Sequence, residues 1–321
     1  MSGWLWTMLA GSAGIFALYG LRCAKAVRLP ALRKRAWETA MLSFLFSVVF
    51  GTVLARGGYA LLTQELDFEY DGIAALEQLL EFEIDSLSFL GGALGVFLGV
   101  MLANRLTRRG SVIVGMDAFA PFGALLTALF RLGELFFGSY GAGGPLPEGS
   151  PFAFFPFAVK ITAAGGYESW CGAVCVLSAV FALIWAGIAF FRLRSRGRTG
   201  LSLTLTLFFL ALPQILCESL RKRGIFWLFV HTEELLCAVV LLAVMLVWVL
   251  QSGKGMGFLQ RWWPLGTLIL GMGALVGVEF AIDGKYFGLA IPVCYAIMCV
   301  VLIAMGFAGV VAAKRWNENK G

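Results

Sequence analysis

The residues best suited to chemistry are two charged side chains near the end of an apolar stretch. Residues 117–138 read DAFAPFGALLTALFRLGELFFG, and Arg131 and Glu134 lie three positions apart within them. An ionisable side chain at membrane depth costs several kcal/mol unless it is paired or faces water, so it indicates a functional site. A guanidinium offers a fixed fork of donors for a phosphate, and a carboxylate can accept a proton.

Two further ionisable residues, Arg56 and Glu218, lie in other apolar stretches of the chain. Together with the first pair they predict a polar site inside a bundle of helices, in a protein that handles something charged. Structural explanations stand beside this one. Arg131 can snorkel to the membrane interface, and Glu134 can form an i,i+3 ion pair with it.

Composition places the chain among membrane proteins. It has 321 residues, of which 60% are hydrophobic and 14% charged, with mean hydropathy +0.86, whereas soluble domains average about 25% charged residues. The net charge of +6 does not require a nucleic-acid partner, because the basic residues lie in short loops between apolar stretches. Cys171 and Cys175 have no accompanying cluster of ligands, so we expect neither a metal site nor a disulfide.

The elements that position these residues are predicted to be transmembrane helices. A bilayer core of about 30 Å needs about 20 apolar residues per helix, and only helices satisfy the backbone across so many spans. The fold class is therefore an all-α polytopic bundle. The predicted spans are residues 4–21, 39–62, 87–106, 112–137, 170–191, 201–220, 235–250, 264–282 and 287–312.

Loop charges predict the orientation through the positive-inside rule. The connection at residues 22–35 is rich in Lys and Arg, whereas residues 63–86 hold eight acidic residues and no basic one. The first connection is then cytoplasmic and the second external, as is the nearly uncharged segment 139–169. Nine spans give an external N-terminus and a cytoplasmic C-terminus.

Two segments carry open alternatives. The basic residues 221–223 follow the sixth span and fall outside; we favour a patch that faces anionic head groups over a miscounted span or a local exception. Residues 63–85 place leucines and isoleucine at helical spacing between glutamates. They form either a helix at the membrane surface or an ordinary solvated loop helix.

Five stretches in order resemble motifs of one bacterial family. GTVLARGGY (51–59) is similar to G-x-x-G-A-R-x-x-Y, and SFLGGALG (88–95) to S-F-H-G-G-L-x-G. Residues 117–138 resemble D-L-x-A-P…G-R-I-G-N-F-x-N-G. Tyr167-Glu168 matches a Y-E element, and QILCESLR (214–221) matches R-F-x-x-E-x-x-R. These motifs are those of the prolipoprotein diacylglyceryl transferase family. The resemblance implies a seven-span core at residues 1–250, followed by two additional spans and a cytoplasmic tail at residues 251–321.

The resemblance also implies a reaction. The family, in the bacterial plasma membrane, transfers a diacylglyceryl group from phosphatidylglycerol to the cysteine thiol of a preprolipoprotein signal peptide, without a cofactor. The residues expected to contact phosphatidylglycerol are Arg56, Tyr59, Gly91, Gly92, Arg131, Gly133, Gly138 and Arg221. Those expected to take part in catalysis are Arg131, Glu134 and Glu218.

The chain departs from the family pattern at five positions. Leu90 replaces the histidine of H-G-G, and Gln214 replaces the first arginine of R-F-x-x-E-x-x-R. Glu134 and Phe137 replace two asparagines, and Ser139 replaces an acid. Leucine cannot carry a proton. An alternative is therefore a divergent paralogue that binds anionic lipid or a lipoprotein partner without transfer; a transporter is disfavoured, since no inverted repeat is seen.

Two more residues complete the expectations. Glu168 is expected at the start of the fifth helix, where the helix dipole favours an acid. His231, the chain's one histidine, is expected to be a bystander near the external end of the seventh span.

Overall fold

The structure is a computed structural model that describes residues 2–26, 29–63, 87–107, 111–162, 167–192, 198–221, 226–227, 230–252, 257–282 and 290–318. In this part of the chain, nine helices are long and apolar enough to cross a membrane, as predicted. They are α1 (Ser2–Lys25), α2 (Pro30–Thr63), α4 (Phe89–Thr107), α5 (Val112–Gly133), α6 (Val174–Arg192), α7 (Leu201–Leu220), α8 (Thr232–Gln251), α9 (Phe258–Ile282) and α10 (Ile291–Glu318).

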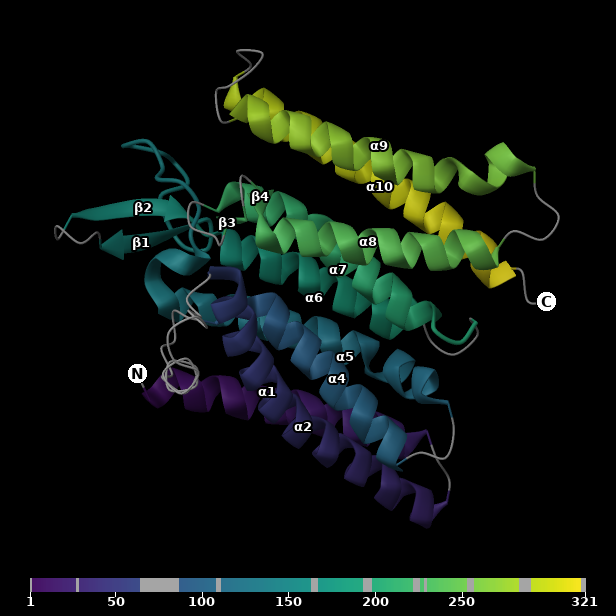
Figure 1. The fold of residues 1–321 in the computed structure, drawn as a ribbon. Helices are drawn as coiled ribbons and strands as arrows, with labels where there is room; N and C mark the ends of the chain where they lie inside the picture. Colours follow the sequence, from purple (N-terminus) through teal and green to yellow (C-terminus); the bar gives the residue numbers. More distant parts are fainter. Residues whose placement is uncertain are drawn as a thin grey trace, which may run out of the picture.

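The helices lie side by side in one bundle (Figure 1). Helices α1, α2 and α4 lie at one side, α5 to α8 in the middle, and α9 and α10 on the far side of α8. The N-terminus and the β-strands lie at one end of the bundle, and the C-terminus at the other.

Glycines on α4 allow it to pack closely on α2. A Cβ on Gly99 would lie 2.6 Å from the backbone nitrogen of Ser47, and one on Gly91 or Gly95 would collide with backbone carbonyl oxygens of α2. Within a bilayer, such small residues let two helix backbones approach. Helix packing therefore explains Gly91 without a bound substrate, whereas a Cβ on Gly92 would make only ordinary contacts.

The last two helices belong to the largest apolar core. Leu241, Met245 and Trp248 of α8 pack with Leu268 of α9 and Met298 of α10, all fully buried. The indole nitrogen of Trp248 donates to the hydroxyl oxygen of Thr204 at 3.0 Å, which satisfies the one polar atom of this large side chain. Helices α9 and α10 are thus continuous with the core.

An aspartate of α5 fixes the start of α7. The carboxylate of Asp117 accepts hydrogen bonds from the backbone nitrogens of Gly200 and Leu203, the latter at 2.8 Å. Gly200 has φ = +93°, a conformation that suits glycine. Asp117 therefore caps α7 from another helix, in the way that an N-cap residue satisfies free N–H groups.

Two short antiparallel hairpins lie at the N-terminal end of the bundle (Figure 1). Strand β1 (Ala158–Thr162) pairs with β2 (Glu168–Gly172), and β3 (Phe226–Trp227) pairs with β4 (Val230–His231). A short 3₁₀ helix, η2 (Glu134–Gly141), follows α5.

The first hairpin corrects two predictions. The fifth span was expected to start at residue 170, but residues 168–172 form β2 and α6 begins at Val174. Glu168 does not start a helix; it lies in β2 and forms an ion pair with Lys160 of β1. The predicted surface helix at 63–85 lies almost entirely outside the described residues, as do Lys222 and Arg223.

Candidate functional site

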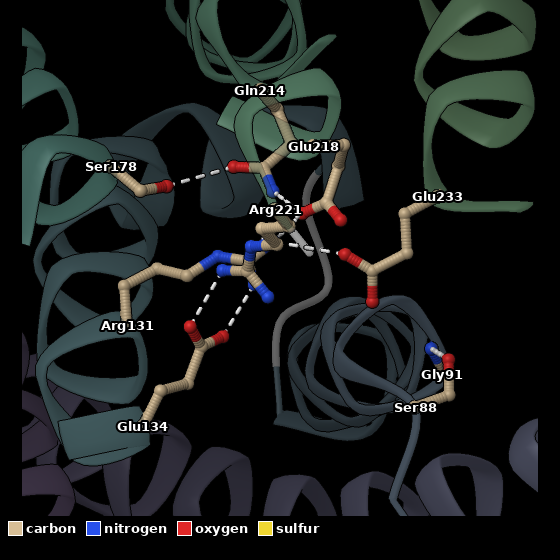
Figure 2. A network of polar contacts seen from close by, with 9 residues as sticks. All are labelled: Ser88, Gly91, Arg131, Glu134, Ser178, Gln214, Glu218, Arg221 and Glu233. Atoms are coloured by element: carbon tan, nitrogen blue, oxygen red, sulfur yellow. Dashed lines mark hydrogen bonds and ion pairs between the residues drawn. The ribbon is translucent and has the colours of Figure 1, made fainter. Parts of the chain in front are cut away.

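Charged side chains from α5, α7 and α8 meet at the end of the bundle that carries the hairpins (Figures 1 and 2). Arg131 of α5 is fully buried, with 0% of its surface exposed. Its guanidinium forms an ion pair with Glu134, lies 3.1 Å from Oε2 of Glu233 and lies 3.4 Å from Oε1 of Glu218. One guanidinium thus contacts carboxyl groups of three elements.

A second guanidinium completes the cluster. Arg221 directly follows α7, and its Nη2 lies 2.6 Å from Oε2 of Glu134, while its Nε lies 3.2 Å from Oε1 of Glu218. Burial and the charge of Arg131 lower the pKa of Arg221, but the neighbouring carboxylates raise it above its ordinary value. Arg221 therefore stays cationic.

Neutral side chains close the cluster on two sides. The amide nitrogen of Gln214 donates to Oε1 of Glu218, and its amide oxygen accepts from the hydroxyl of Ser178 at 2.9 Å (Figure 2). The ring of Phe89 covers the guanidinium of Arg131, with 3.6 Å between the ring centroid and Cζ. Such a contact is a cation–π interaction.

The cluster holds more carboxyl groups than guanidiniums. Arg131 and Arg221 face Glu134, Glu218 and Glu233, so full ionisation would leave one surplus negative charge. Both guanidiniums are therefore paired within the protein.

The structure brings four of the predicted site residues into contact: Arg131, Glu134, Glu218 and Arg221. The sequence predicted guanidiniums that receive a phosphate, but in the structure carboxyl groups pair with both. The predicted i,i+3 pair of Arg131 and Glu134 is present.

The other predicted residues have separate surroundings. Arg56 and Tyr59 lie on α2, with 5.9 Å between the guanidinium carbon and the ring centroid. Gly133 allows Met8 of α1 to approach, since a Cβ there would lie 2.9 Å from the sulfur. Gly138 lies in η2, where the side-chain environment is outside the described residues.

Sequence reasoning missed three members of the cluster. Glu233 was left in a loop because the seventh span was predicted to start at residue 235, whereas α8 begins at Thr232. Phe89 and Ser178 carry no charge, so nothing in their type indicated a contact with ionisable groups. An acid in the first turn of an apolar helix was the available signal for Glu233.

A family model described as prolipoprotein diacylglyceryl transferase matches residues 7–250. The chain belongs to this family. No curated protein and no solved structure matches the chain. Helices α9 and α10 lie beyond the matched residues of the diacylglyceryl transferase model.

Two residues that the sequence analysis singled out, Leu90 and Gln214, lie at or beside this cluster. Gln214 donates to Glu218 but brings no charge. Leu90 follows Phe89, whose ring contacts Arg131. The leucine side chain can neither accept nor donate a proton. Among the described residues, the carboxyl groups that contact Arg131 and Arg221 are those of Glu134, Glu218 and Glu233.

Proposed function

We propose that this protein transfers a diacylglyceryl group from phosphatidylglycerol to the cysteine thiol of a preprolipoprotein signal peptide in the bacterial plasma membrane. Membership of the diacylglyceryl transferase family supports this reaction. So does a buried cluster of charged side chains at one end of the membrane-spanning bundle.

One observation carries the proposal: the carboxylate of Glu134 bridges two arginines. One of its oxygens pairs with Arg131 and the other with Arg221. A phosphodiester also presents two anionic oxygens, and arginine binds carboxylate and phosphate with the same fork of donors. The head group of phosphatidylglycerol would take the position of this carboxylate and release it.

The released carboxylate gives the reaction its base. The thiol proton passes to Glu134 or Glu218, and the thiolate attacks the glyceryl carbon that is bonded to the phosphate oxygen. A C–S bond forms, the C–O bond breaks, and the electron pair leaves on glycerol phosphate. Arg131 and Arg221 stabilise the charge of the leaving phosphate.

We place the cluster at the external leaflet. The supporting feature is the loop charge, which puts the N-terminus outside and the C-terminus in the cytoplasm. The cluster lies where α7 ends and α8 begins, at the end of the bundle that carries the N-terminus (Figure 1). Phosphatidylglycerol would enter from the outer leaflet, where the signal peptide presents its cysteine.

A second candidate is a paralogue that binds anionic lipid or a lipoprotein partner without transfer. The observation in its favour is that Leu90 stands where the family has a histidine. A positioned general base contributes about 10²–10⁴-fold to a rate, so a chain without a replacement base would bind its lipid and leave it intact.

A direct transfer assay separates the two candidates. The purified protein is placed in vesicles that contain phosphatidylglycerol, together with a labelled signal peptide that carries the lipobox cysteine. Transfer predicts a lipidated peptide and one glycerol phosphate for each peptide modified. A peptide with serine in place of that cysteine, and vesicles of phosphatidylethanolamine alone, are the controls. Lipid binding without either product would favour the paralogue.

A further inference from the structure

An exposed aromatic segment precedes the first hairpin. Residues 152–157 read FAFFPF, and the nearest charged residues are Glu148 before them and Lys160 after them. Four phenylalanine side chains in this segment are between 49% and 61% exposed: those of Phe152, Phe154, Phe155 and Phe157. A contiguous exposed apolar patch indicates a surface that binds a membrane or another molecule. We call residues 152–157 the aromatic turn.

The aromatic turn is an ordered structure. The ring centroid of Phe157 lies 5.3 Å from that of Phe154 and 5.8 Å from that of Phe152, and both pairs meet edge to face. The backbone is closed as well, because the carbonyl oxygen of Phe154 accepts from the nitrogens of Phe157 and Ala158 at 3.0 and 2.9 Å. The rings are therefore held together at the surface of the protein.

Phe157 fixes the aromatic turn at the level where a helix leaves the membrane. Its carbonyl oxygen accepts from the backbone nitrogen of Ala173 at 2.9 Å, and the membrane-spanning part of α6 begins at the next residue, Val174. Leu177 and Val180, in the first two turns of α6, are 37% and 43% exposed. The aromatic turn thus adjoins a helix whose exposed apolar side chains face lipid.

The head-group region of a bilayer is the partner that fits this surface. Aromatic side chains gather where head groups meet acyl chains, and Tyr167, directly before β2, is 81% exposed. Backbone polar groups can leave water only when they are paired, and the carbonyl oxygens of Phe154 and Phe157 are paired. The aromatic turn can therefore enter lipid without leaving these groups unsatisfied.

A row of backbone pairs links the aromatic turn to the charged cluster. Ala158, which follows the turn, pairs with Gly172 of β2. The nitrogen of Gly143 donates to the carbonyl oxygen of Gly172 at 2.8 Å, and Gly143 forms an isolated β-bridge with Arg221. Four segments of the chain thus lie side by side between the aromatic turn and Arg221, so a force that holds the turn also holds this arginine.

We propose that the aromatic turn inserts into the head-group region of the leaflet at the hairpin end of the bundle, beside α6. It anchors the first hairpin there and holds Arg221 at the level of the lipid phosphates. The anchor does not depend on the proposed transfer reaction.

Photocrosslinking tests the lipid contact directly. A benzophenone amino acid replaces Phe155 in one variant, Phe152 in a second and Glu148, an exposed residue of the same loop, in a control. Each protein is illuminated in vesicles of phosphatidylethanolamine and phosphatidylglycerol, and adducts are identified by mass spectrometry. We expect lipid adducts at positions 152 and 155 and none at 148. Because two positions are labelled, one that disturbs the fold leaves the other to be measured.

The absence of a lipid adduct at both phenylalanine positions would overturn the anchor, as would equal labelling at position 148. An adduct with another protein chain alone would overturn it in favour of a protein partner. If the lipid adducts form but the unmodified protein fails the transfer assay, the proposed function fails and the anchor stands.

Hydrogen exchange in nanodiscs tests the link to the cluster. A double variant, Phe152→Ser with Phe155→Ser, is compared with Phe152→Leu and Phe155→Leu, which keep apolar side chains. We expect the amides of Gly143 and Gly172 to exchange about tenfold faster or more in the serine variant, because it loses the burial of two rings in lipid. The leucine variant is expected to match the unmodified protein. Equal exchange in the two variants would overturn the link between the aromatic turn and Arg221.

Discussion

Nη2 of Arg221 lies 2.6 Å from Oε2 of Glu134, although the two residues are 87 positions apart. This contact joins the end of α7 to the start of η2, and the backbone of Arg221 also forms an isolated β-bridge with Gly143. The segment after α5 is thereby held against the end of α7, which keeps both guanidiniums around one carboxylate.

Replacement of Glu134 by glutamine tests whether this carboxylate occupies the place of a phosphate. The amide cannot repel an anion, so we expect phosphatidylglycerol to bind about tenfold more tightly, a gain of about 1.4 kcal/mol. Lipid binding to the protein in nanodiscs measures this, with Glu148→Gln as the control. Weaker or equal affinity would contradict the proposed displacement. A transfer rate that falls while affinity rises would identify Glu134, rather than Glu218, as the base.

Arg131→Ala is expected to abolish the binding of phosphatidylglycerol, because it removes one of the two guanidiniums proposed to receive the phosphate. Removal of one partner from a buried ion cluster also costs about 3–5 kcal/mol of stability. Arg131→Lys separates the two effects, since it keeps the charge and loses the fork of donors. We expect affinity to fall by about tenfold or more in Arg131→Lys and to be unchanged in Arg105→Lys, whose side chain is exposed. Equal affinities in the two lysine variants would refute the role of Arg131.

Two glycine substitutions test the packing of α2 on α4. A Cβ on Gly99 would lie 2.6 Å from the backbone of Ser47, whereas one on Gly187 of α6 meets nothing within 4 Å. We expect Gly99→Ala to lower the free energy of unfolding by about 1–3 kcal/mol. Gly187→Ala is expected to be neutral or to stabilise by up to about 1 kcal/mol. Thermal unfolding in detergent compares them, and similar melting temperatures would argue against the close contact.

Asp117→Ala should loosen the start of α7. The variant removes the acceptor for the backbone nitrogens of Gly200 and Leu203, and loss of a helix cap costs about 0.5–2 kcal/mol. Amide hydrogen exchange is expected to speed up in the first turn of α7. Ser111→Ala is the matched control, because Ser111 precedes α5 and its side chain makes no capping bond. Equal exchange in both variants would show that Asp117 does not cap α7.

The spans were predictable because their signal is local. Residues 201–220 were predicted as a span and α7 has these bounds, since about 20 successive apolar residues need no distant partner to indicate a helix. The strand β2 was not predictable in this way. Its residues adjoin the apolar run of α6, and only the pairing with β1 separates them from it.

Four members of the candidate site were predictable, but its balance of charge was not. Arg131, Glu134, Glu218 and Arg221 were expected because ionisable side chains near membrane helices are costly. That Glu134 pairs with two arginines depends on the placement of Arg221 beside η2, which no spacing along the chain reveals. Glu234 and Glu279 likewise become neighbours only through the packing of α9 on α8.

The packing of α9 and α10 on α8 also affects how far this protein can be shortened. A chain cut after Gln251 would keep every residue of the family match. It would lose α9 and α10, which pack against Trp248, and with them Glu279, the neighbour of the buried Glu234. A carboxyl left facing hydrocarbon costs several kcal/mol. Removal of α9 and α10 is therefore expected to destabilise the part of the chain that matches the family.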